Sequence, residues 1–245
     1  MRILVVSDLH YTLRQLDWVA ARAGDYDLVV VAGDLLDVAS SVAPDAQIAV
    51  ALEYLTRMAR ATTVVACSGN HDLTARNELD ERAAPWLAAA RGAGVFVDGS
   101  RIDADDVLIT VCPWWDGPRT RAVVDRQLAE DAERVAGRRW VWVYHSPPGD
   151  SPTSWTGSRY YADDDLTAWI ARHRPDIVLC GHVHESPFVP GGGWFDRIGT
   201  TAVFNAGRQI GPVPTCIELD TALGTARWTS AERSDELSLA GVEPT

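Results

Sequence analysis

Five clusters of chemistry-bearing residues each follow a short apolar run in this sequence. The clusters lie at residues 7–10, 33–37, 68–72, 145–148 and 181–185. Together they hold five of the six histidines, several aspartates and an asparagine. Imidazoles, carboxylates and an amide, with no thiolate among them, suit Zn, Fe or Mn. The clusters therefore predict a metal site.

The spacing of these side chains favours convergence on one site. Asp8 and His10 are two residues apart, and so are His182 and His184; on an extended chain, residues two apart face the same side. Glycines at positions 33, 69 and 181 would let the backbone turn sharply beside the site. The set has more ligands than one ion needs, so we expect two divalent metal ions that clamp an in-line displacement at phosphorus.

The elements that must position these clusters alternate along the chain. Continuous apolar runs predict buried strands at 3–6, 28–32, 63–66, 140–144 and 177–180. Helical patterns occupy 13–23, 44–60, 77–91, 121–135 and 163–172, the last capped by an aspartate. Short strands, expected to be antiparallel, lie at 95–97, 101–104 and 107–111, and hairpins are expected at 194–198, 202–205, 215–219 and 225–229. This alternation predicts a mostly parallel sheet covered by helices, with ligands at the carboxyl ends of its strands.

Length and composition restrict the class of protein. The 245 residues contain no linker or repeat, so we expect a single domain over 1–245, with a frayed tail after about residue 230. No apolar run is long enough to span a membrane, and the first carboxylate comes too early for a signal peptide, so we expect a cytoplasmic protein without a membrane partner. The net charge of −12 disfavours duplex nucleic acid as a partner. All 22 basic residues are arginine, which excludes lysine chemistry.

The chain resembles the calcineurin-like metallophosphoesterases over about residues 3–207. The motifs Asp8-x-His10, Gly33-Asp34, Gly69-Asn70-His71-Asp72, His145 and Gly181-His182-x-His184 occur in that family's order. The sequence is most similar to small prokaryotic phosphoesterases related to class III cyclic-nucleotide phosphodiesterases. The motifs for that subgroup are His145-Ser146-Pro147-Pro148, Glu185 and Phe204-Asn205-Ala206-Gly207. The resemblance implies an α+β fold, a four-layer α-β-β-α sandwich of two mixed β-sheets flanked by helices.

The resemblance also implies roles for the matching residues. One metal would be held by Asp8, His10, Asp34 and His184, and the other by Asp34, Asn70, His145 and His182. Asp34 would bridge the metals, and a metal-bound hydroxide would attack phosphorus. His71 would act beside the leaving group as an acid or an electrostatic stabiliser.

Several assignments keep alternatives at this stage. Asp37 is the predicted partner of His71 in catalysis, and Asp72 competes with it. Trp114 and Trp115, in a Pro/Gly-rich loop, are predicted to contact a flat group of the substrate, and Arg208 to offset its charge. The expected activity is hydrolysis of a small nucleotide-like phosphodiester. The alternatives are a phosphomonoesterase or nucleotidase with the same centre, and a metal-binding scaffold without turnover.

Overall fold

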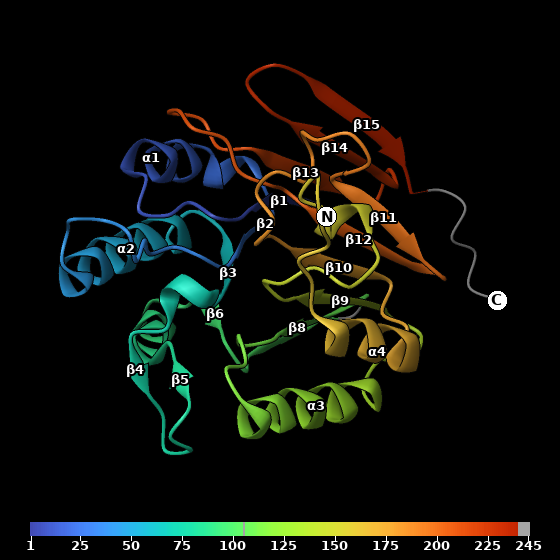
Figure 1. The fold of residues 1–245 in the computed structure, drawn as a ribbon, viewed down its shortest axis with the longest axis horizontal. Helices are drawn as coiled ribbons and strands as arrows, with labels where there is room; N and C mark the ends of the chain where they lie inside the picture. Colours follow the sequence, from blue (N-terminus) through green and yellow to red (C-terminus); the bar gives the residue numbers. More distant parts are fainter. Residues whose placement is uncertain (105, 240–245) are drawn as a thin grey trace.

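Two β-sheets lie face to face between two layers of helices in the computed structural model, which describes residues 1–104 and 106–239 (Figure 1). The seven-stranded sheet has the order β15-β14-β13-β1-β2-β3-β6, and the six-stranded sheet has the order β11-β12-β10-β9-β8-β7. The predicted four-layer α-β-β-α fold is therefore confirmed.

The first sheet joins the two ends of the chain. Its strands are β1 (Arg2–Val6), β2 (Leu28–Ala32), β3 (Thr63–Cys67), β6 (Phe96–Val97), β13 (Cys216–Asp220), β14 (Thr225–Thr229) and β15 (Ser234–Ser238). β1, β2, β3 and β6 run parallel, and β13 pairs with β1 in the antiparallel direction. α1 (Leu13–Arg22), α2 (Pro44–Ala59) and the 3-10 helix η3 (Pro85–Ala93) pack on the outer face of this sheet.

The second sheet carries the middle of the chain. Its strands are β7 (Arg101–Asp103), β8 (Val107–Val111), β9 (Arg139–Val143), β10 (Ile177–Cys180), β11 (Phe195–Ile198) and β12 (Thr201–Asn205). β8, β9, β10 and β12 run parallel, while β7 and β11 are antiparallel edge strands. α3 (Pro118–Ala132) and α4 (Asp164–His173) cover the outer face. As predicted, an aspartate caps α4: the Asp163 carboxylate accepts the N–H groups of Asp165 and Leu166.

The central strands are apolar throughout because each one is buried on both faces. In β1, Ile3 and Val5 face the core between the sheets, whereas Leu4 and Val6 face α1 and α2. Side chains alternate between the two faces of a strand. A strand between a second sheet and a helix layer therefore needs apolar residues at every position, which explains the runs seen in the sequence.

The helix predicted over residues 77–91 was wrong. The chain instead forms the small hairpin of β4 (Ala75–Arg76) and β5 (Arg82–Ala83), followed by η3. The Asn77 side chain accepts two backbone N–H groups of its own turn, which competes with a helix. The Glu81 carboxylate accepts the N–H groups at the start of α3, 2.9 Å from Arg119 N and 2.6 Å from Thr120 N.

Two smaller expectations are also corrected. The strand predicted at 95–97 is not antiparallel, because β6 joins the first sheet parallel to β3. The tail after residue 230 is not frayed over Ser234–Ser238, because these residues pair with β14 as β15. The part of that prediction that concerns residues 240–245 lies outside the described residues. Arg227 on β14 donates to the Glu236 carboxylate on β15 at 2.7 Å. The polar composition of this strand reflects its edge position rather than disorder.

Within the part of the chain that the structure describes, every helix is too short or too polar to cross a membrane.

The indole of Trp228 links the last hairpin to the core between the sheets. It is fully buried, and its Nε1 donates to the Ala206 carbonyl oxygen at 2.8 Å. We expect Trp228→Ala to lower the free energy of unfolding by about 3–5 kcal/mol, because the substitution leaves a cavity in the core. Urea denaturation measures this change. The control is Leu223→Ala, at a side chain that is 75% exposed, with an expected change below about 0.5 kcal/mol. A change below about 1 kcal/mol for Trp228→Ala would contradict its role in the core.

Candidate metal centre

The predicted ligands converge at the carboxyl ends of strands from both sheets. Loops after β1, β2 and β3 supply Asp8, His10, Asp34 and Asn70, and loops after β9 and β10 supply His145, His182 and His184. The loops are joined by backbone hydrogen bonds, such as His10 N–H to the Asp34 carbonyl at 2.9 Å. Facing sheets therefore bring five distant segments to one place.

Ligand atoms form three compact groups around the two central carboxylates. The groups are Asp8, His10 and His184; His10, Asp34 and His71; and Asp34, His145 and His182, and within each group the atoms lie within 4.8 Å of one another. The distance from His184 Nε2 to Asp8 Oδ1 is 3.2 Å, and that from His145 Nε2 to Asp34 Oδ2 is also 3.2 Å.

Backbone strain aims four of these side chains. Asp8, His10, Asp34 and His182 have φ values of 54°, 42°, 53° and 70°, in the left-handed region that non-glycine residues rarely adopt. The sequence predicted that residues two apart face the same side because the chain is extended there. That reason is wrong, because the backbone is left-handed at Asp8, His10 and His182. His182 and His184 belong to different ligand groups. Such strain persists where surrounding contacts hold it, and it clusters at functional sites.

Space and backbone conformation require glycine at positions 33, 69 and 181. Gly33 has a φ of +86°, and a Cβ there would collide with the His145 ring. A Cβ at Gly69 would collide with the Asp34 carboxylate, and one at Gly181 with Ser7 and Asp8. Only Gly33 makes the sharp turn that the sequence predicted. The other two glycines are needed because the backbone passes so close to the carboxylates.

Burial of the two carboxylates and the charges around them set the pKa values of the groups in the cluster. Burial alone would raise the pKa of Asp8, but the hydrogen bond from His184 and the charge of His145 hold it well below its usual range. Burial lowers the pKa values of His10 and His182 to about 4, so both rings are neutral near pH 7. For His145, Asp34 and Asp8 outweigh burial and raise the pKa to about 9.

The donor set fits divalent cations. The Oδ1 atom of Asn70 is buried and has no hydrogen-bond partner among the described residues. His10 Nε2 and His184 Nε2 lie 3.0 Å apart, and Asp8 Oδ1 lies 3.8 and 3.2 Å from them. His145 donates its Nδ1–H to the Ala32 carbonyl at 2.7 Å, so its Nε2 faces the cluster, as is usual for a metal-ligating histidine. Buried carboxylates and an unpaired amide oxygen together suit a positive ion.

His71 lies at the edge of the cluster with a defined proton position. Its ring packs edge-on against His10 at 4.4 Å. The Val38 N–H donates to His71 Nδ1 at 3.2 Å, so the neutral ring carries its proton on Nε2. Asp37 Oδ1 lies 3.8 Å from the same Nδ1, beyond hydrogen-bond distance.

Asp72 has a different role from that considered in the sequence. Its buried carboxylate accepts backbone N–H groups from Gly69 at 2.9 Å and Leu36 at 3.0 Å, which ties together the loops after β2 and β3. Burial, followed by the charge of Asp34, raises its pKa to about 7. Because Asp72 binds the backbone of these loops, Asp37 is the carboxylate that lies beside His71.

The predicted substrate contacts fall around the cluster. The Trp114 ring lies 5.2 Å from His182 and 5.6 Å from His145. Together with Trp115 it lines a cavity of about 520 Å³ next to His182. Arg208 donates its backbone N–H to the His184 carbonyl at 3.1 Å, and its positive charge contributes to the low pKa of His10.

Two features of the site were not predicted from the sequence. Tyr161 stacks on His182 with ring centroids 5.0 Å apart, and the only sequence signal was an aromatic pair just before the α4 cap. Ser68 accepts the Trp114 N–H at 3.0 Å, while its own N–H donates to the partly buried Asp98 carboxylate at 2.8 Å. These bonds fix the Trp114 loop to the loop after β3.

Comparison with known proteins agrees with this geometry. The family model of the calcineurin-like phosphoesterases matches residues 1–186. The chain belongs to this family. Members of the family use a dinuclear divalent metal centre, and the ligand groups described above support metal-dependent phosphoester hydrolysis. No curated protein matches the chain.

Solved structures share the fold at low sequence identity. TT1561 of Thermus thermophilus has a TM-score of 0.63 at 15% identity, covering 97% of this chain and 98% of that one. Purple acid phosphatase PPD1 from yellow lupin seeds has a TM-score of 0.55 at 12% identity, covering 99% of this chain and 52% of that one. At such identities the likeness shows the fold alone.

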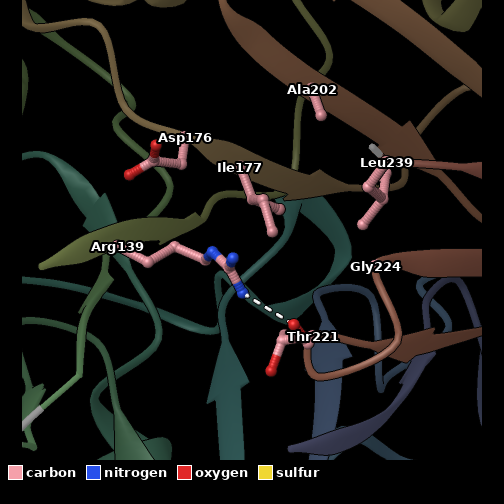
Figure 2. A pocket seen from close by; sticks show the side chains of 7 residues that line it. All are labelled: Arg139, Asp176, Ile177, Ala202, Thr221, Gly224 and Leu239. Carbon is pink, nitrogen blue, oxygen red and sulfur yellow. Dashed lines mark hydrogen bonds between the residues drawn. The ribbon is translucent and has the colours of Figure 1, made fainter. Parts of the chain in front are cut away.

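A cavity far from the cluster has no part in this chemistry. Its volume is about 220 Å³, and it lies where β9, β10 and β12 begin, next to the β13–β14 turn (Figure 2). Figure 2 shows the Arg139 side chain donating to the Thr221 carbonyl oxygen, at 3.4 Å. No predicted ligand lines this cavity, which faces the opposite ends of the parallel strands.

Removal of the shared carboxylate tests the centre directly. Asp34 belongs to two of the three ligand groups, so we expect Asp34→Ala to abolish binding of Mn²⁺ at both positions. Calorimetric titration of metal-free protein measures the stoichiometry, with thermal unfolding as a check on the fold. The control is Asp45→Asn, at an exposed residue in the first turn of α2. Retention of two ions with unchanged affinity by Asp34→Ala would contradict the assignment.

Proposed function

We propose that this protein is a phosphodiesterase that hydrolyses a small phosphodiester at a centre of two divalent metal ions. The observation that carries the proposal is that two separate cavities reach the ligand cluster. One cavity, of about 520 Å³, includes His182 in its lining, and the other, of about 270 Å³, includes His71. The two cavities share no residue. A phosphodiester has two substituents to place, whereas a monoester has one.

The ligand groups support a division of the cluster between two ions. We propose that Asp8, His10, Asp34 and His184 hold one ion, and that Asp34, Asn70, His145 and His182 hold the other. When bound, the two ions would polarise the phosphoryl oxygens and lower the pKa of a water molecule between them. Mn, Fe and Zn all suit these ligands. The four cysteines are buried and free, which fits the proposed cytoplasmic location.

His71 is placed to act on the leaving group. Its Nε2 carries the ring proton, because Nδ1 accepts from Val38, and the ring forms part of the smaller cavity. We propose that Nε2–H donates to the departing oxygen, which stabilises the charge that develops there. Asp37 Oδ1 lies 3.8 Å from Nδ1, and we propose that this carboxylate helps to position the ring. Arg208 would offset charge on the phosphate from the His10 side.

A variant of His71 separates metal binding from turnover. We expect His71→Ala to retain both metal ions and to lower kcat by about 10²–10³, since it removes a proton donor but none of the proposed ligands. Metal content and steady-state rates on bis-p-nitrophenyl phosphate give the two readouts, with Asp45→Asn as the unaffected control. A kcat near the wild-type value would show that His71 has no part in the chemistry.

Paired chromogenic substrates test the proposed activity. With Mn²⁺ added, we expect kcat/KM for bis-p-nitrophenyl phosphate to exceed that for p-nitrophenyl phosphate, because only the diester fills both cavities. Preference for the monoester would instead indicate a phosphomonoesterase or nucleotidase. Two bound metals with neither substrate cleaved would favour a metal-binding scaffold.

A further inference from the structure

We propose that the cavity beside His182 binds a cationic substituent of the substrate, such as a quaternary ammonium group. The inference rests on the proposed phosphodiesterase function and identifies the class of substrate. It comes from the walls and charges of this cavity, which is lined by aromatic rings and carboxylates and by no arginine.

The aromatic walls are held in place before any ligand arrives. Trp115 donates its Nε1–H to the Asp163 carboxylate at 2.8 Å, and the Tyr144 hydroxyl donates to the same oxygen at 2.6 Å. Trp114 is fixed by its backbone bond to Ser68. Tyr161, stacked on His182, is about half exposed. Walls that are already ordered lose little conformational entropy when a ligand binds.

The charges of the cavity are negative. Four aspartates line it, at positions 116, 163, 164 and 165. Asp165 is paired with Arg121, and the Asp163 carboxylate is occupied by uncharged donors. In the part of the chain that the structure describes, Asp116 and Asp164 have no ion-pair partner, and Asp116 accepts only the backbone N–H of Arg82. The cavity is therefore lined by carboxylates that have no ion-pair partner among the described residues.

Arginines near the cavity do not reverse this balance. Arg121 is neutralised by Asp165, and Arg119 points its guanidinium at the Leu79 carbonyl. The Arg159 guanidinium lies over Tyr161 at 5.5 Å, on an exposed loop. None of these three arginines lines the cavity.

Rings and carboxylates select for the same kind of ligand. The aromatic walls alone would accept any flat group, including a nucleobase. The faces of indole and phenol rings also attract cations, and unpaired carboxylates add a Coulombic attraction. A further phosphate on the substrate would be repelled. The favoured substrate thus carries its phosphodiester at the metal ligands and a positive group in the cavity.

The orientation of such a substrate follows from the position of His71. Water adds to phosphorus, and the bond between phosphorus and the substituent that is not cationic breaks. The oxygen of that substituent departs with the electron pair. Because His71 belongs to the smaller cavity, the group there is the one that leaves. The cationic substituent stays on the phosphate product.

Two isosteric substrates test the inference. p-Nitrophenyl phosphocholine and p-nitrophenyl 3,3-dimethylbutyl phosphate share a leaving group and a shape, but only the first is cationic. We expect kcat/KM to be at least about tenfold higher for the choline ester. The double variant Asp116→Asn/Asp164→Asn should bring the ratio of the two values towards one. Both side chains are on the surface, so these substitutions preserve the fold.

The matched control is Glu53→Gln, which removes one negative charge from an exposed position on α2. It should leave the ratio unchanged. Equal kcat/KM values for the two esters, in an enzyme that still cleaves bis-p-nitrophenyl phosphate, would overturn the cation site and leave the phosphodiesterase proposal standing.

Direct binding of choline tests the proposed cation site independently of turnover. We expect choline chloride to bind saturably to the wild-type protein, as followed by saturation-transfer NMR, and to bind at least about fivefold more weakly to the double variant. If no diester is cleaved, the phosphodiesterase proposal fails, and the choline titration still tests the cavity. No saturable binding, or equal binding by both proteins, would overturn the inference.

Discussion

Two carboxylates that are almost wholly buried, those of Asp8 and Asp34, repel each other at the centre of the ligand cluster. Burying like charges is costly unless positive groups surround them. The protein supplies one imidazole that the carboxylates keep charged, His145, whereas burial keeps His10 and His182 neutral. The cluster is thus an arrangement that cations stabilise, and the surrounding structure is organised to hold it.

The structure around the cluster holds these two carboxylates in place. Left-handed backbone at four of the predicted ligands aims the side chains inward, and glycines let neighbouring strand ends approach the carboxylates. Asp72 ties the loops after β2 and β3 through their backbone N–H groups. The two facing sheets supply the rigid base, since their central strands are buried on both sides. Stable packing below the site holds the strained conformations above it.

The net charge of −12 is distributed in a way that suits a charged substrate. Metal ions at the cluster would offer positive charge to a phosphate, while the cavity beside His182 keeps unpaired carboxylates. Opposite local fields a short distance apart orient a dipolar ligand more strongly than the overall charge of the protein does. The fold itself does not decide this distribution, because one fold can carry many different sites.

The sequence by itself indicated most of the strands and helices and the polar clusters that converge at one site. Continuous apolar runs marked the buried strands, and each polar cluster stood where such a strand ended, because parallel strands bring their carboxyl ends to one edge. Local patterns did not reveal that Glu81 caps α3, because its partners Arg119 and Thr120 are distant in the chain. They also did not reveal that the polar segment Ser234–Ser238 adds an edge strand beside β14. Only the tertiary structure decided which groups the ligands form, which carboxylate lies beside His71, and how Tyr161 and four aspartates enclose a cavity. These are distances between side chains on separate loops, which packing fixes and sequence spacing does not.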